Sequence, residues 1–148
     1  MRDSILLSIC IPTYNRASYL NLCLERVIDQ VTIDMPVEII VSDNFSTDNT
    51  IEVASKYSDL PFFQLIKQPY NKGPMKNGLE LVKEYANGRF CWFVGDDDYV
   101  VPGAINNLIN LIKLNNCDFI FLNIQSVNSD VDFNKYKLNS KYNYEQLL

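Results

Sequence analysis

Three consecutive carboxylates, Asp96, Asp97 and Asp98, follow an apolar run that ends at Val94. Carboxylates this close repel one another and must be solvated or neutralised. Because alternate residues of an extended segment point the same way, Asp96 and Asp98 would share a cation, or the turn would present Asp97. An all-oxygen site without His or Cys suits Mg²⁺ or Mn²⁺. A solvated acidic turn ahead of a helix explains the same residues, and the triad alone leaves both interpretations open.

Two cations favour a bound anion near the triad. Arg16 and Lys76 each fall in the first turn of an expected helix, where the macrodipole disfavours positive charge by ~0.3–1 kcal/mol. A diphosphate would use helix N-termini, cationic side chains and a carboxylate-held divalent ion together. The alternative is two solvent-facing side chains tolerated at a small cost. Lys72 and Gly73 most simply form a turn, although Lys72 would also reach a phosphate.

Asp43 and Tyr14 each follow another apolar run, and each has two interpretations. Asp43 would accept the imino N–H of a pyrimidine, or it would form a local Asx-turn or cap for the helix near Ser46. Tyr14 would stack on a base, or it would line the core, as aromatic residues more often do. Spacing alone does not separate these roles.

The elements that must position these residues alternate regularly. Short apolar runs rich in Ile, Val and Phe predict buried strands whose starts are about 25–32 residues apart, close to the ~30 residues of a βαβ unit. Helical patterns lie between them, with Ser46 as an N-cap and Pro74 and Pro102 at helix starts. This pattern predicts an α/β fold, a Rossmann-like open, mostly parallel sheet with helices on both faces. The expected strands are 5–11, 37–41, 62–66, 90–94 and 119–122, and the expected helices are 16–29, 47–57, 75–85 and 103–114.

In such a sheet, ligands bind at the carboxyl ends of the strands. The segments that follow the first four expected strands are all polar. We therefore expect them to converge on one edge of the sheet.

Composition excludes several classes of function. The 148 residues include no His, which removes Ser-His and Cys-His nucleophile pairs. A net charge of −5 argues against a protein that coats nucleic acid. The four Cys form no C-x-x-C, so we expect reduced thiols rather than disulfides or a zinc site. The first apolar run is too short to span a membrane and no cleavage site follows it, so we expect a cytoplasmic protein without a transmembrane segment.

Four short segments stand at the expected strand ends, namely 8–16 (SICIPTYNR), 41–48 (VSDNFSTD), 71–73 (NKG) and 94–98 (VGDDD). In this order they resemble family 2 glycosyltransferases of the GT-A fold, and the resemblance covers about residues 7–122. It implies that residues 1–123 form a nucleotide-sugar-binding region. Residues 124–148 are then expected to be an irregular or weakly helical tail that begins an acceptor-side region.

The resemblance also implies a donor site with four parts: a nucleoside segment, an acidic residue for the base, a basic residue by the diphosphate and a DxD-type motif. In this sequence the nucleoside segment matches Pro12, Thr13 and Tyr14 with Asn15 and Arg16. The acidic residue for the base matches Asp43, and the basic residue by the diphosphate matches Lys76. The DxD-type motif matches Asp96 with the metal-binding Asp97 and Asp98.

Two positions depart from the family pattern. Gly95 replaces the usual first Asp of the DxD-type motif, so which of the three carboxylates touches the ribose and which the metal stays open. The family's frequent acidic pair after the second strand is Asp43-Asn44 here.

The activity that the resemblance implies is an inverting single displacement. An acceptor hydroxyl attacks the anomeric carbon of the donor while Mg²⁺ or Mn²⁺ stabilises the departing diphosphate. The acceptor would be a glycan or a lipid-linked molecule in surface polysaccharide synthesis, and the full-length protein would associate peripherally with the inner face of the membrane.

The carboxylate base of that reaction has no convincing candidate after Leu122, because Asp130, Asp132 and Glu145 lie in unpatterned sequence. We expect it beyond Leu148, in a chain truncated before the acceptor half. The alternative function is a non-catalytic fragment that binds the nucleotide sugar without transferring it. A dinucleotide-dependent oxidoreductase is disfavoured, since G-x-G-x-x-G is missing after the first strand.

Overall fold

The computed structural model describes residues 5–114, 118, 120 and 122. The chain divides into two compact units, Met1–Val100 and Val101–Leu148. The first unit contains the sheet with its helices, and the second contains α4 (Ala104–Leu114). Residues 119 and 121 of the expected strand 119–122 and the whole tail 124–148 lie outside the described residues, and residues 120 and 122 are described but belong to no strand.

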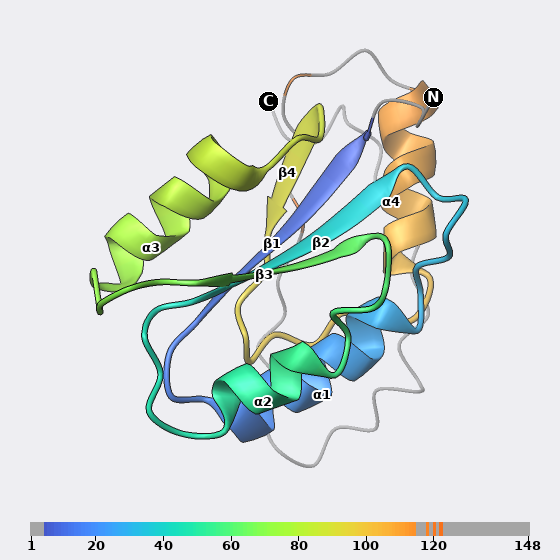
Figure 1. Ribbon diagram of the computed structural model, residues 1–148. Coiled ribbons are helices and arrows are strands. Elements are labelled where there is room, and N and C mark those ends of the chain that lie inside the picture. Colours follow the sequence, from blue (N-terminus) through green and yellow to red (C-terminus); the bar gives the residue numbers. More distant parts are fainter. Residues whose placement is uncertain (1–4, 115–117, 119, 121, 123–148) are drawn as a thin grey trace. The chain divides into compact units, whose positions relative to one another are not determined.

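Four parallel strands form the sheet of the first unit: β1 (Leu7–Thr13), β2 (Val37–Asp43), β3 (Phe63–Lys67) and β4 (Phe90–Phe93). Their order is β3-β2-β1-β4 (Figure 1). The chain therefore moves outward from β1 to β3 and then returns to the other side of β1. This reversal makes the carboxyl ends of β1 and β4 flank a topological switch point, where open α/β sheets bind ligands.

Helices lie on both faces of this sheet, as the sequence predicts (Figure 1). On one face lie α1 (Ala17–Ile28) and α2 (Thr50–Ser55). On the other lies α3 (Pro74–Glu80), which continues as the π-helical turn η1 (Leu81–Tyr85). The core beneath η1 is made of fully buried Cys10, Ile40 and Leu81. No helix among the described residues is both long and apolar enough to cross a membrane.

The outer strands differ from the prediction that both faces of the sheet are covered. All residues of β1 and β2 except Pro12 and Glu38 are buried, whereas β4 alternates between partly buried and exposed residues. Phe93 of β4 is 51% exposed. In β3 only Phe63 is buried, so both outer strands of the described sheet are less buried than the two central strands.

One helix start differs from the predictions by more than one residue. The helix expected from residue 47 begins at Thr50, and Ser46 does not cap it. Instead the Ser46 hydroxyl accepts the backbone N–H of Asn15, because the loops after β1 and β2 lie side by side. The helix expected from residue 103, just after Pro102, begins at Ala104.

Candidate functional site

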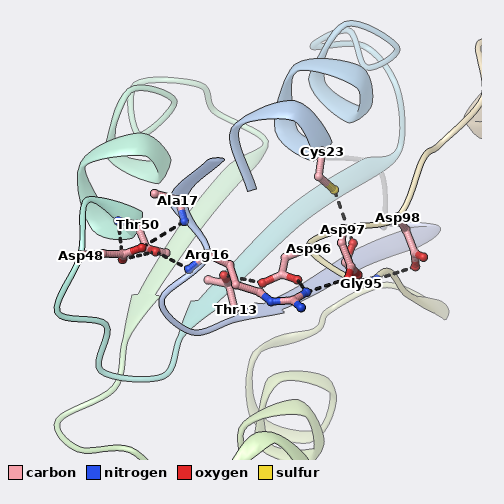
Figure 2. Close-up of polar contacts among 10 residues, drawn as sticks. All are labelled: Thr13, Arg16, Ala17, Cys23, Asp48, Thr50, Gly95, Asp96, Asp97 and Asp98. Carbon is pink, nitrogen blue, oxygen red and sulfur yellow. Dashed lines mark hydrogen bonds and ion pairs between the residues drawn. The ribbon is translucent and has the colours of Figure 1, made fainter. Parts of the chain in front are cut away.

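The ends of β1 and β4 meet through a buried carboxylate. Thr13 is the last residue of β1, and its hydroxyl donates to Oδ2 of Asp96 at 2.8 Å. Both residues are buried, with exposures of 4% and 6%. Arg16 completes the cluster, since its Nη1 lies 3.0 Å from Asp96 Oδ1 and 2.7 Å from Asp97 Oδ2 (Figure 2). The predicted convergence of the first and fourth strand ends is thus present.

Arg16 neutralises part of the acidic triad. Its hydrogen bonds to Asp97 and then Asp96 raise its already high pKa, so the guanidinium stays charged at every relevant pH. The same group lies 5.2 Å from the centre of the Tyr19 ring. Because the side chains of Arg16 and Asp97 are 44% and 49% exposed, this pair contributes about 1 kcal/mol or less to stability. A ligand that replaced either member of this ion pair would therefore cost the fold little stability.

The acidic loop itself is a tight turn held by α1. Asp98 accepts the backbone N–H of Gly95 through Oδ2 at 2.7 Å, and its own N–H donates to the Gly95 carbonyl at 3.0 Å. The thiol of Cys23, on α1, donates to the same carbonyl at 3.6 Å (Figure 2). Burial raises the pKa of Cys23 to about 12, so it remains a protonated donor. Sequence patterns did not indicate this contact, which joins residues far apart in the chain.

The residues described contain no group of three or more Cys, Asp or Glu arranged to hold a metal ion. Asp96 is fully engaged by Thr13 and Arg16, while Asp97 and Asp98 are exposed. Carboxylate oxygens are the ligands that Mg²⁺ and Mn²⁺ prefer. The chemistry of these oxygen donors fits such an ion, and Asp97 and Asp98 are the exposed carboxylates of the triad that could hold it.

Asp43 ends β2 and has one unsatisfied oxygen. Its Oδ2 accepts the backbone N–H of Ser46 at 3.0 Å, which is the local turn that the sequence allowed. Its Oδ1 is buried, in a residue only 1% exposed, and has no hydrogen-bond partner among the residues that the structure describes. A buried acceptor without a donor is unusual in a folded protein, and a ligand that brings an N–H would satisfy it.

The loops after β1 and β2 are joined by side-chain hydrogen bonds that sequence reasoning missed. Asn15 has a φ of 52°, a left-handed backbone that Asn tolerates better than most residues. The run of Ser, Thr and Asp at 46–50 was the available signal. The bonds are Asn15 N to Ser46 Oγ, Thr47 N and Thr47 Oγ1 to Asn15 Oδ1, Arg16 N to Thr50 Oγ1 and Ala17 N to Asp48 Oδ2.

The remaining predicted residues have different surroundings. Pro12 lies in β1 opposite Ser42 and is partly buried. Tyr14 is 42% exposed, so it does not line the core. Lys76 lies in α3 with a 58% exposed side chain, 4.0 Å from Glu80. Within the described part of the chain, no ion pair or shared partner brings Lys76 together with Arg16.

Lys72 is also committed to a protein partner. Its ammonium pairs with Glu80 and lies 5.8 Å from the centre of the Tyr70 ring. The hydrogen bond to Glu80 is the largest cause that raises the pKa of Lys72. The turn interpretation of Lys72 and Gly73 therefore agrees with the structure.

Comparison with known proteins identifies relatives of this arrangement. The sequence model of Glycosyl transferase family 2 matches residues 8–148. An abequosyltransferase of Salmonella typhimurium is 41% identical over 103 residues, which is 68% of this chain and 31% of that protein. A UDP-Glc:alpha-D-GlcNAc-diphosphoundecaprenol beta-1,3-glucosyltransferase of Escherichia coli is 28% identical over 99% of this chain and 56% of its own length. The chain thus spans about a third to a half of these relatives.

A solved structure has the same fold. TarS of Staphylococcus aureus, in complex with UDP-GlcNAc, superposes with a TM-score of 0.67 and 28% sequence identity. The match covers 74% of this chain and 31% of that one. The parallel sheet described above is therefore that of a GT-A protein.

Proposed function

Because the chain belongs to Glycosyl transferase family 2, we propose that it binds the donor for transfer of a sugar from a nucleoside diphosphate to a glycan or lipid-linked acceptor. Residues 1–123 would bind the donor, and residues 124–148 would begin the acceptor-side region. The names of the relatives and the UDP-GlcNAc complex of TarS support a nucleotide sugar as the donor. Surface polysaccharide synthesis at the cytoplasmic face of a membrane is the proposed setting.

The observation that carries this proposal is the unsatisfied Oδ1 of Asp43. Recognition of a base requires a fixed acceptor for its imino N–H, and Oδ1 is buried while Oδ2 is anchored to Ser46. Tyr14, exposed at the end of the neighbouring strand, is proposed to stack on the base. Pro12 and Asn15 are proposed to shape this nucleoside end.

The diphosphate end is assigned to the cluster around Arg16. Asp97 and Asp98 would hold Mg²⁺ or Mn²⁺, which when bound supplies a Lewis acid for the departing diphosphate. Arg16, released from Asp97, would pair with phosphate oxygens, and Thr13 would keep Asp96 oriented toward the ribose. Lys76 is proposed as a second cation that reaches the diphosphate after it leaves Glu80.

The proposed reaction is a single displacement with inversion. The acceptor oxygen forms a bond to the anomeric carbon as the bond from that carbon to the diphosphate oxygen breaks. The hydroxyl proton passes to a carboxylate base that we place beyond Leu148. We therefore expect this chain to bind the donor without transferring its sugar, and measurable transfer to an acceptor would place a base within these residues.

Calorimetric titration of the chain with UDP in the presence of Mn²⁺ tests the donor site. Asp43→Ala and Asp97→Ala should each weaken binding by about tenfold or more, since each removes a charge-assisted contact worth ~1.5–3 kcal/mol. Asp59→Ala is the matched control, because Asp59 is exposed in the loop that enters β3 at its amino end. Unchanged affinity in both site variants would remove the assignment.

A further inference from the structure

Asn44 connects the ends of β1 and β2 to the segment 71–73, which follows β3. It follows β2 directly and is 2% exposed. Its backbone N–H donates to the carbonyl of Thr13, at the end of β1, at 2.9 Å. Its side-chain Oδ1 accepts the backbone N–H of Lys72, and its Nδ2 donates to Oδ1 of Asn71, both at 2.9 Å. Since Thr13 also binds Asp96, Asn44 connects the segment after β3 to the rest of the candidate site.

Backbone donors determine which way both amides point. Oδ1 of Asn71 also accepts the backbone N–H of Gly73 at 2.9 Å. Each amide oxygen therefore faces a backbone N–H, and the amino group of Asn44 must face the oxygen of Asn71. A carboxylate at position 71 would keep both of its bonds, because Asn71 uses only its oxygen in them. A carboxylate at position 44 would lose the donor and set two oxygens against each other.

We propose that Asn44 is a positioning residue that holds the segment 71–73 against the base end of the donor site. The proposal rests on the function proposed above. Asn44 follows Asp43 in the chain, so a shift of the Asn44 side chain would move the unsatisfied Oδ1 of Asp43, which is assigned to the base. Because Asn44 is buried, water does not replace a lost partner there.

Asn44→Asp and Asn71→Asp form a matched pair of tests, since each converts one amide to a carboxylate. UDP affinity in Mn²⁺ should fall by about tenfold or more in Asn44→Asp at pH 8 and change by less than about threefold in Asn71→Asp. A protonated carboxyl at position 44 again donates a hydrogen bond. The affinity of Asn44→Asp relative to the native chain should therefore recover as the pH falls to about 5.5, because burial and the neighbouring Asp43 carboxylate both favour the protonated form of the introduced carboxyl.

A measurement without ligand separates this inference from the proposed function. Protection of the Lys72 and Gly73 amides against hydrogen exchange, relative to the native chain at the same pH, should fall in Asn44→Asp and persist in Asn71→Asp. Equal behaviour of the two variants, or lost protection with unchanged UDP affinity, would overturn the positioning role. If the native chain does not bind UDP, the proposed function fails, and retained protection in Asn44→Asp would overturn the inference independently.

Discussion

Replacing Arg16 with Gln should change metal binding and nucleotide binding in opposite directions. In the structure, Nη1 of Arg16 donates hydrogen bonds to both Asp96 and Asp97. A divalent ion that binds the triad competes with this guanidinium for the same carboxylate oxygens. Arg16→Gln should therefore raise the Mn²⁺ affinity of the nucleotide-free chain, whereas it should lower the affinity for UDP in Mn²⁺ because it removes the proposed phosphate partner.

The magnitudes follow from the exposure of the pair. An ion pair this exposed is worth ~0.2–1 kcal/mol, so its removal should tighten Mn²⁺ binding by a factor of about 1.4 to 5. A charge-assisted hydrogen bond to phosphate is worth ~1.5–3 kcal/mol, so UDP binding should weaken by about tenfold to a hundredfold. Added salt should reduce the gain in Mn²⁺ affinity, since exposed charges are screened.

Free Mn²⁺ can be followed by electron paramagnetic resonance during a titration, with and without UDP. Arg26→Gln is the control, because Arg26 lies on α1, which Arg16 directly precedes, but contacts the Leu22 carbonyl and the Tyr99 ring. The reasoning is refuted if Arg16→Gln weakens Mn²⁺ binding in the absence of UDP, or if it behaves like Arg26→Gln.

Three further predictions concern the stability and reactivity of the fold. Gly88→Ala should destabilise the chain by about 2–3 kcal/mol in urea unfolding, because the added Cβ would lie 2.6 Å from the backbone nitrogen of Ser8; a loss below ~0.5 kcal/mol would contradict this close approach. Cys91 is exposed, whereas Cys10 is buried and burial raises its pKa to about 12. Maleimide at pH 8 should therefore label Cys91 in the native chain and Cys10 only after unfolding, which peptide mass spectrometry would show. Equal labelling rates of the two thiols would contradict this prediction. Burial raises the pKa of Asp48, but the hydrogen bonds that it accepts outweigh burial and lower it below its unfolded value. Its carboxylate therefore stabilises the fold above that unfolded pKa, near 4, and this contribution of at most ~1 kcal/mol is lost as the pH falls further. Asp48→Asn should flatten the acid side of the curve of unfolding free energy against pH. An unaltered curve would contradict this prediction.

The fold was largely predictable because its strands are local apolar runs. The four strands within the described residues lie within two residues of the expected bounds, and α1 and α3 begin within one residue of theirs. The exposed face of β4 was not predictable, since Phe and Trp there resemble a buried strand. Whether such a strand is covered depends on its place in the sheet and not on its own residues.

The candidate site divides in the same way. Motif order and residue type placed Thr13, Arg16, Asp43 and the acidic triad at strand ends. They did not indicate that Ser46 would bind Asn15 or that Asn44 would anchor the next loop.

The sequence by itself determined the α/β class, the polar strand ends and the absence of histidine chemistry, because these depend on local pattern and composition. Only the tertiary structure decided that Arg16 would neutralise carboxylates 80 and 81 positions away and that one oxygen of Asp43 would be left unsatisfied. The physical reason is the strand order, which places β1 between β2 and β4. Side chains that no sequence spacing relates thereby come within hydrogen-bonding distance.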